Sequence, residues 1–157
     1  MIQRIQTVYL FLVGVLMTVA AILPVAEFVD TANKTLYQLD YRGIVLMNSN
    51  GTVHSAINSN PTTFLYGIIL IITIIAIFKY KNRKQQFRLA TINFILIVIY
   101  IILLAVDIYL GQRKIAGTDL LLKIPAVLPV IALIVDYLAM RGISKDENLV
   151  KSMDRLR

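Results

Sequence analysis

Two aspartates lie within long apolar segments, and these residues have the clearest capacity for chemistry. Asp107 ends an uncharged run that begins at Leu89, and Asp136 lies within the apolar segment 120–140. A carboxyl group enclosed among apolar residues can bind a proton, carry an ion or hold helices together. The two aspartates cannot share a proton as a catalytic pair does, because helical geometry separates them by roughly 20 Å.

Two more polar residues precede Asp107 at intervals of seven. Asn93, Tyr100 and Asp107 therefore lie on one face of a helix. With Asp136 they form a candidate polar network in the interior. The simplest interpretation is structural, with each carboxylate held by a neighbour. The partners available to Asp107 are Arg113, Lys114 and Lys123, and those near Asp136 are Asn93, Arg88 and Arg4.

The composition argues against most catalytic and metal sites. The chain has no cysteine and a single histidine, His54. Disulfides, thiol catalysis and zinc sites with several His or Cys ligands are therefore excluded. No nucleophile and base are placed together, so we expect no enzymatic activity, no cofactor and no metal. The net charge of +7 does not predict nucleic-acid binding, because the basic residues flank apolar segments.

The elements that carry these residues are predicted to be membrane-spanning helices. Hydrophobic residues make up 58% of the 157, and the mean hydropathy is +0.74, above the roughly 45 to 50% apolar content of soluble domains. Four segments have about the length needed to cross a hydrocarbon core of roughly 30 Å. They are residues 5–26, 61–78, 89–108 and 120–140. The sequence thus predicts one domain, 1–157, with the fold class of a membrane all-α four-helix transmembrane bundle.

The distribution of basic residues predicts the orientation. With four spans, the amino terminus, the loop 79–88 and the tail 141–157 share one side. This side carries eleven of the sixteen Lys and Arg residues, and the other side carries five. By the positive-inside rule, both termini are predicted to be cytoplasmic.

The outer insert 27–60 is predicted to contain a β-hairpin. Asn50-Gly51 favours a two-residue turn, which would pair Met47 with His54 and Val45 with Ala56. Apolar residues at every second position from Tyr37 to Met47 predict one longer strand. Since an isolated hairpin is marginally stable, we expect either a third strand from residues 27–35 or packing of the hairpin on the helix ends.

The tail is predicted to form a short amphipathic helix on the inner membrane surface or against a partner. Ser144 and Glu147 have the spacing of a capping box. Leu149, Met153 and Leu156 lie on one face of such a helix. The candidate cytoplasmic docking residues combine the loop and the tail: Arg83, Lys84, Arg88, Leu149, Lys151, Met153, Asp154, Arg155 and Leu156.

Three segments together resemble a known family. They are the opening residues 1–10, the loop 82–89 and the closing residues 145–157. This pattern is similar to an uncharacterised family of four-helix membrane proteins from Bacteroidota, domain of unknown function 4293. The resemblance implies a bacterial inner-membrane protein and brings no catalytic residues. Its cytoplasmic motifs favour a cytoplasmic partner.

Three functions remain open from the sequence. The leading hypothesis is a non-catalytic accessory or scaffolding subunit that binds another membrane or cytoplasmic protein. Its expected partners are membrane lipids and a protein partner or a second copy of the chain, and not nucleic acid. One alternative is a small transporter or ion pathway through the polar network. The other is an envelope sensor that binds a ligand near Tyr37, Tyr41 and His54.

Overall fold

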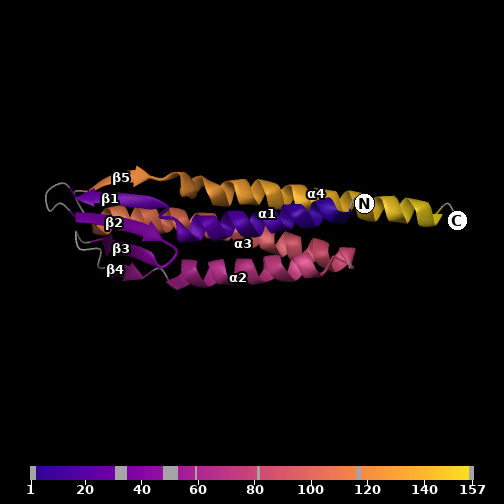
Figure 1. Ribbon diagram of the computed structural model, residues 1–157, viewed down its shortest axis with the longest axis horizontal. Helices are drawn as coiled ribbons and strands as arrows, with labels where there is room; N and C mark the ends of the chain where they lie inside the picture. Colours follow the sequence, from indigo (N-terminus) through magenta and orange to yellow (C-terminus); the bar gives the residue numbers. More distant parts are fainter. Residues whose placement is uncertain are drawn as a thin grey trace.

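The computed structural model describes residues 3–30, 35–47, 53–58, 60–80, 82–115 and 118–155. Four helices run side by side along the long axis of the molecule, and a β-sheet lies at one end (Figure 1). The helices are α1 (Gln3–Ile22), α2 (Asn60–Phe78), α3 (Arg83–Lys114) and α4 (Leu128–Arg155). Helices α1 and α3 each pack against α2 and α4.

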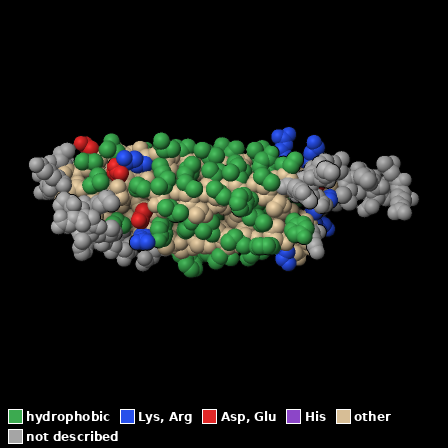
Figure 2. Space-filling model, viewed as in Figure 1, with side chains coloured by type: hydrophobic (Ala, Val, Ile, Leu, Met, Phe, Trp, Pro, Cys, Tyr) green, Lys and Arg blue, Asp and Glu red, His purple; other side chains and the backbone are tan. Residues whose placement is uncertain are grey.

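Most side chains of the bundle are apolar, both inside and outside. Val13, Ile69 and Ile97 are fully buried in its core. Large apolar side chains also point outward, among them Phe11 at 62% and Phe64 at 74% exposure, and they cover the middle of the molecule in Figure 2. Each helix contains a window long and apolar enough to cross a membrane. The prediction of four apolar, span-length helices is thereby confirmed.

The sheet has five antiparallel strands, one more than the insert alone supplies. Strands β1 (Ala26–Asp30), β2 (Thr35–Asp40), β3 (Gly43–Met47) and β4 (Val53–Asn58) lie between α1 and α2. Strand β5 (Thr118–Leu122) follows α3 and pairs with β1, giving the order β4-β3-β2-β1-β5. The expected third strand is present as β1.

Helix α3 continues past the end of α2 that lies nearest the sheet, and it supports the sheet (Figure 1). Phe28 of β1 and Ile44 of β3 are buried on the face that meets this helix. A Cβ atom at Gly111 would lie 2.7 Å from atoms of both side chains. Glycine at this position therefore allows the close approach of α3 to the sheet.

The single long strand predicted from Tyr37 to Met47 is wrong, because the chain turns at Tyr41-Arg42. The backbone N–H of Arg42 donates to the Asp40 carboxylate at 2.7 Å, and Gly43 adopts a positive φ of 122°. Both features favour a tight turn. Leu39 pairs with Ile44 across the two-residue turn. Residues at every second position therefore point to one face of the sheet before the turn and to the opposite face after it.

The predicted hairpin register holds on only one side of a β-bulge. Ile44 pairs with Ile57 in the predicted register, but beyond the irregularity at Ile44/Val45 His54 pairs with Leu46 instead of Met47. A bulge places an extra residue in one strand and shifts every pair beyond it. The Asn50-Gly51 turn lies outside the described residues.

The fourth predicted span begins too early, because residues 118–122 form β5. A 3-10 helix, Ile124–Val127, follows, and α4 begins at Leu128. Pro125 and Pro129 explain the delay, since proline lacks a backbone N–H and is accommodated in the first turn of a helix.

The separate tail helix is also wrong, because α4 continues without a break to Arg155. Ser144 and Glu147 lie inside this helix and do not mark a new beginning. A helix of 28 residues extends about 42 Å, and α4 projects beyond the other helices in Figure 1.

Candidate functional site

Helix α4 projects beyond the bundle after Asp146, at the end opposite the sheet (Figure 1). Polar contacts hold α4 at Asp146, which is the base of this projection. Gln6 Nε2 of α1 donates to Asp146 Oδ2 at 2.6 Å, and both residues are buried. Arg83 Nη1, at the start of α3, donates to the Asp146 backbone oxygen at 3.1 Å. Gly142 admits the Gln6 side chain, since a Cβ there would lie 3.2 Å from Gln6 Cγ. Helix α4 is thus held by two other helices just before it leaves the bundle.

Basic side chains gather at this same end, as the blue atoms at the right of Figure 2 show on the visible face. Lys84, Arg88, Arg141 and Lys145 are all exposed. The last nine residues of α4, from 147 to 155, add about 14 Å of helix beyond Asp146. The end of the bundle therefore presents a basic rim with a projecting helix.

The polar candidates of the interior separate into two groups. Asp136 and Asn93 are both 0% exposed, and the Asn93 side chain interacts with the Asp136 carboxyl. Asn93 Oδ1 also accepts a hydrogen bond from Thr73 Oγ1 at 3.2 Å. This middle layer joins α2, α3 and α4.

The second group lies closer to the sheet. Asp107 Oδ2 accepts a hydrogen bond from Thr62 Oγ1 at 2.6 Å. Tyr100 is buried and its ring lies 6.5 Å from that of Tyr66, which in turn lies 6.2 Å from the Tyr41 ring. Asn93 and Asp107 are fourteen residues apart on α3, or about 21 Å, so the four candidates do not form one site.

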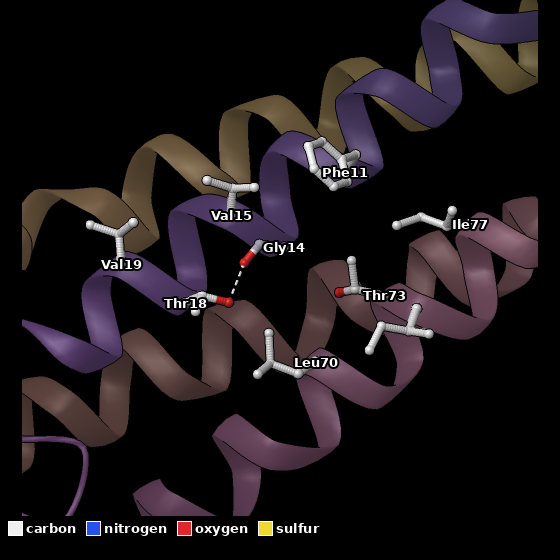
Figure 3. A pocket seen from close by; sticks show the side chains of 9 residues that line it. Phe11, Gly14, Val15, Thr18, Val19, Leu70, Thr73 and Ile77 are labelled. Atoms are coloured by element: carbon white, nitrogen blue, oxygen red, sulfur yellow. Dashed lines mark hydrogen bonds between the residues drawn. The ribbon is translucent and has the colours of Figure 1, made fainter.

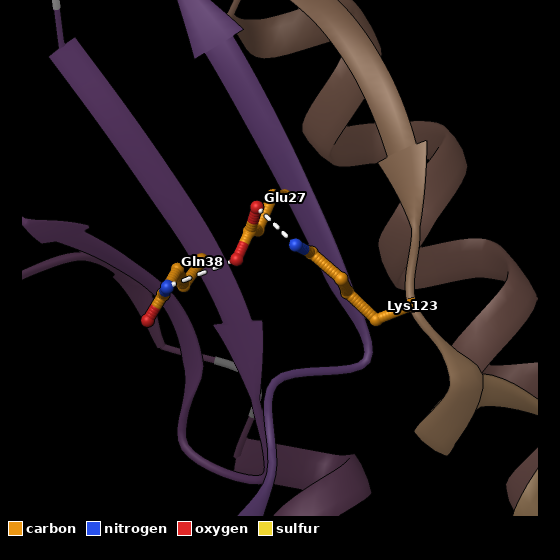
Figure 4. A network of polar contacts seen from close by, with 3 residues as sticks. All are labelled: Glu27, Gln38 and Lys123. Carbon is orange, nitrogen blue, oxygen red and sulfur yellow. Dashed lines mark hydrogen bonds and ion pairs between the residues drawn. The ribbon is translucent and has the colours of Figure 1, made fainter.

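Two of the three basic residues expected near Asp107 have other contacts. Lys123 Nζ forms an ion pair of 2.8 Å with Glu27, which also accepts a hydrogen bond from Gln38 Nε2 (Figure 4). The Arg113 guanidinium lies 4.9 Å from the centre of the Tyr109 ring. Among the described residues, no group of three or more His, Cys, Asp or Glu side chains is arranged to hold a metal ion.

An apolar groove of about 330 Å³ separates parts of α1 and α2 (Figure 3). Its two hydroxyl groups are directed to their own helices, Thr18 to the Gly14 oxygen and Thr73 to the Ile69 oxygen, each at 2.8 Å. The groove therefore offers carbon surface and no free polar group from these threonines.

The comparison with protein families agrees with the resemblance seen in the sequence. The family model for Domain of unknown function (DUF4293) matches residues 2–156. The chain belongs to the DUF4293 family. No curated protein matches the sequence. Membership covers almost the whole chain and assigns no activity.

In this DUF4293 chain, the predicted docking residues differ in their surroundings. Arg83 is half-buried and bonded to α4, whereas Lys84 and Arg88 are exposed. Five others lie in the last part of α4, where the helix is described and the side chains are not: Leu149, Lys151, Met153, Asp154 and Arg155. Leu156 lies outside the described residues.

Gln6 and Asp146 were absent from the predicted site, although they form its best-defined contact. Their positions are 140 residues apart, so no local pattern pairs them. The sequence did contain one indication that Asp146 is buried. It follows Ala139 and Ile143 at helical spacing, and both of these residues are buried. A charged residue at a core position of an apolar face indicates a buried partner.

Proposed function

We propose that this DUF4293 protein is a multi-pass protein of a bacterial inner membrane that acts as a non-catalytic scaffold. Its four helices cross the bilayer, both termini are cytoplasmic, and the basic end presents α4 to a protein partner. The observation that carries the proposal is the continuous projection of α4 from a base fixed by Gln6, Arg83 and Asp146.

The exterior of the bundle supports membrane insertion. Helices that are apolar on every face are either enclosed by protein or surrounded by lipid. The outward-facing side chains of all four helices include large exposed apolar residues. The basic rim at one end then faces the anionic inner leaflet, as the positive-inside rule requires.

The fixed base of α4 supports docking. A helix that is rigid before binding loses less conformational entropy when it meets a partner than a disordered segment does. By helical spacing, Leu149 and Met153 follow Asp146 on the same face of α4 at intervals of three and four residues. That face contacts other helices of the bundle up to Asp146, so a partner helix would continue an existing packing arrangement.

The interior does not favour the transport alternative. Between the middle layer and Asp107 on α3, Ile97, Tyr100 and Leu104 are all buried in the core. These closely packed side chains, of which only Tyr100 carries a polar group, separate the two carboxyl groups, and the described residues between them form no continuous polar path.

Topology is tested by single cysteines, which need no background removal because the chain has none. Cysteines replacing Lys84 and Ser152 should be labelled by an impermeant reagent from the cytoplasmic side. A cysteine at Asn50 should be labelled from the other side. Labelling of Asn50→Cys from the cytoplasmic side would overturn the four-span orientation.

Docking is tested by two double variants of the tail. Leu149→Ser with Leu156→Ser should release a bound partner, because the apolar face supplies roughly 1.5 to 3 kcal/mol per fully buried side chain. Lys151→Gln with Arg155→Gln should have the smaller effect if α4 binds protein and the larger effect if it binds anionic lipid. Protease cleavage within 147–155 in native membranes, equal in all variants and in the unmutated protein, would contradict docking.

A further inference from the structure

The middle layer contains polar atoms that are buried and lack hydrogen bonds. Both carboxyl oxygens of Asp136 and the amide nitrogen of Asn93 have no hydrogen-bond partner among the described residues. Both side chains are fully buried, and they interact with each other. Polar groups at this depth are normally satisfied, so two neighbouring unsatisfied groups point to a ligand or a proton between them.

The hydrogen bonds of the neighbouring side chains favour a proton over a ligand in this layer. The Thr73 hydroxyl has one hydrogen but lies near two acceptors, Ile69 O at 2.8 Å and Asn93 Oδ1 at 3.2 Å. Rotating the Asn93 amide by 180° exchanges its oxygen and nitrogen. The amide NH₂ then donates to Thr73 Oγ1, and the Thr73 hydrogen goes to Ile69 O alone.

This rotation turns the Asn93 oxygen toward Asp136, and the oxygen then requires a donor. An ionised carboxylate has only acceptors, whereas a protonated carboxyl has one O–H. Each of the three side chains then makes at least one hydrogen bond when Asp136 carries a proton: Asp136 donates to Asn93, Asn93 to Thr73, and Thr73 to Ile69 O. This chain of hydrogen bonds ties α4 to α3 and α3 to α2.

We propose that Asp136, Asn93 and Thr73 form an intramembrane proton-binding site, with the proton on the Asp136 carboxyl. The site is distinct from the docking surface and does not depend on it. No charged side chain among the described residues acts on Asp136: α2 contributes Thr73, α3 contributes Asn93, and α1 contributes Gly14, which faces Thr73. A proton also needs no cavity, in contrast to a hydrated metal ion.

Infrared spectroscopy of the full chain in lipid vesicles at neutral pH tests the site directly. A protonated carboxyl gives a carbonyl stretch well separated from that of carboxylates. We expect this band in the unmutated protein, its loss in Asp136→Asn, and its retention in the matched control Asp146→Asn. Asn93→Leu should shift the band to higher frequency, because the carboxyl loses its hydrogen-bond acceptor.

Labelling the aspartate carboxyl carbons with ¹³C gives a readout that needs no variant. The carbonyl stretch of a protonated aspartate should move to lower frequency in the labelled, unmutated protein. No protonated-carboxyl band in the unmutated protein, or a band that survives in Asp136→Asn, would overturn the proposal. A carboxylate signal at Asp136 that responds to added sodium would instead show that a metal ion occupies the layer.

Discussion

The two ends of the molecule are joined to the bundle by different kinds of contact. At the sheet end, apolar side chains of β1 and β3 pack directly on α3 at Gly111. At the basic end, buried hydrogen bonds of Gln6 and Arg83 hold α4 at Asp146. Attachment of the sheet depends on close packing of apolar side chains, whereas attachment of α4 at the basic end depends on matched hydrogen-bond donors and acceptors.

This difference suits the proposed role of the basic end. Close apolar packing tolerates little change in volume, so it fixes the sheet firmly on its helix. A buried hydrogen bond costs more when one partner is lost than it contributes when complete. The basic end therefore needs particular residue types at three separate positions of the sequence, and a partner that binds α4 meets a helix of fixed direction.

The largest effect is expected from Gly111→Ala. Its Cβ would lie 2.7 Å from Phe28 Cζ and Ile44 Cδ1, and the buried Phe28 ring has little room to move. We expect a loss of about 1 to 3 kcal/mol in stability, seen as a lower Tm in detergent. Gly67→Ala is the matched control, because nothing lies within 4 Å of its Cβ position. Equal Tm values for the two variants would show that the sheet is not packed closely on α3.

An effect of comparable size is expected from Asp146→Leu, which leaves the buried Gln6 amide without its acceptor. The cost of such an unsatisfied group is about 1 to 3 kcal/mol. Asp146→Asn keeps an acceptor oxygen and should lose much less. Protease cleavage within α4 should increase in the leucine variant and remain low in the asparagine variant. Identical cleavage in both would mean that the contact does not hold the base of α4.

The smallest effect is expected from Lys123→Met at the sheet end. Its ion pair with Glu27 is only partly shielded, because the Lys123 side chain is 43% exposed and the Glu27 side chain 14%. Such pairs contribute at most about 1 kcal/mol and weaken in salt. The Tm difference from the unmutated protein should therefore shrink at high ionic strength. A difference larger than that of Asp146→Leu would reverse the comparison between the ends.

Helices α1, α2 and α3 were predictable from the sequence because each carries a long uncharged run whose length identifies it. The fourth helix was predictable only from the apolar character of a segment that Asp136 interrupts. The sheet was predictable only in part. Strand β5 comes from a segment 88 residues after β1, and its Leu-rich sequence also fits a helix. The turn after Asp40 depends on a local hydrogen bond and on the positive φ of Gly43. A pattern of alternating apolar residues predicts neither of these features.

The candidate site shows the same division between local and distant contacts. Helical spacing placed Asn93 on the inward face, and the structure brings it to Asp136. Spacing on one helix could not find Thr62 for Asp107 or Gln6 for Asp146, because those partners belong to other helices. The continuity of α4 was missed because a capping-box spacing also occurs inside helices, where it marks no boundary.

Photo-crosslinking from α4 in native membranes tests the central claim most directly. A crosslinker replacing Lys151 should give a reproducible protein adduct, and one replacing Arg42 at the sheet end should not give the same adduct. The Lys151 adduct should disappear when Leu149→Ser and Leu156→Ser are added, while the four helices keep their Tm. Adducts with lipid alone at Lys151, or a protein adduct unaffected by the two serines, would contradict docking through the apolar face of α4.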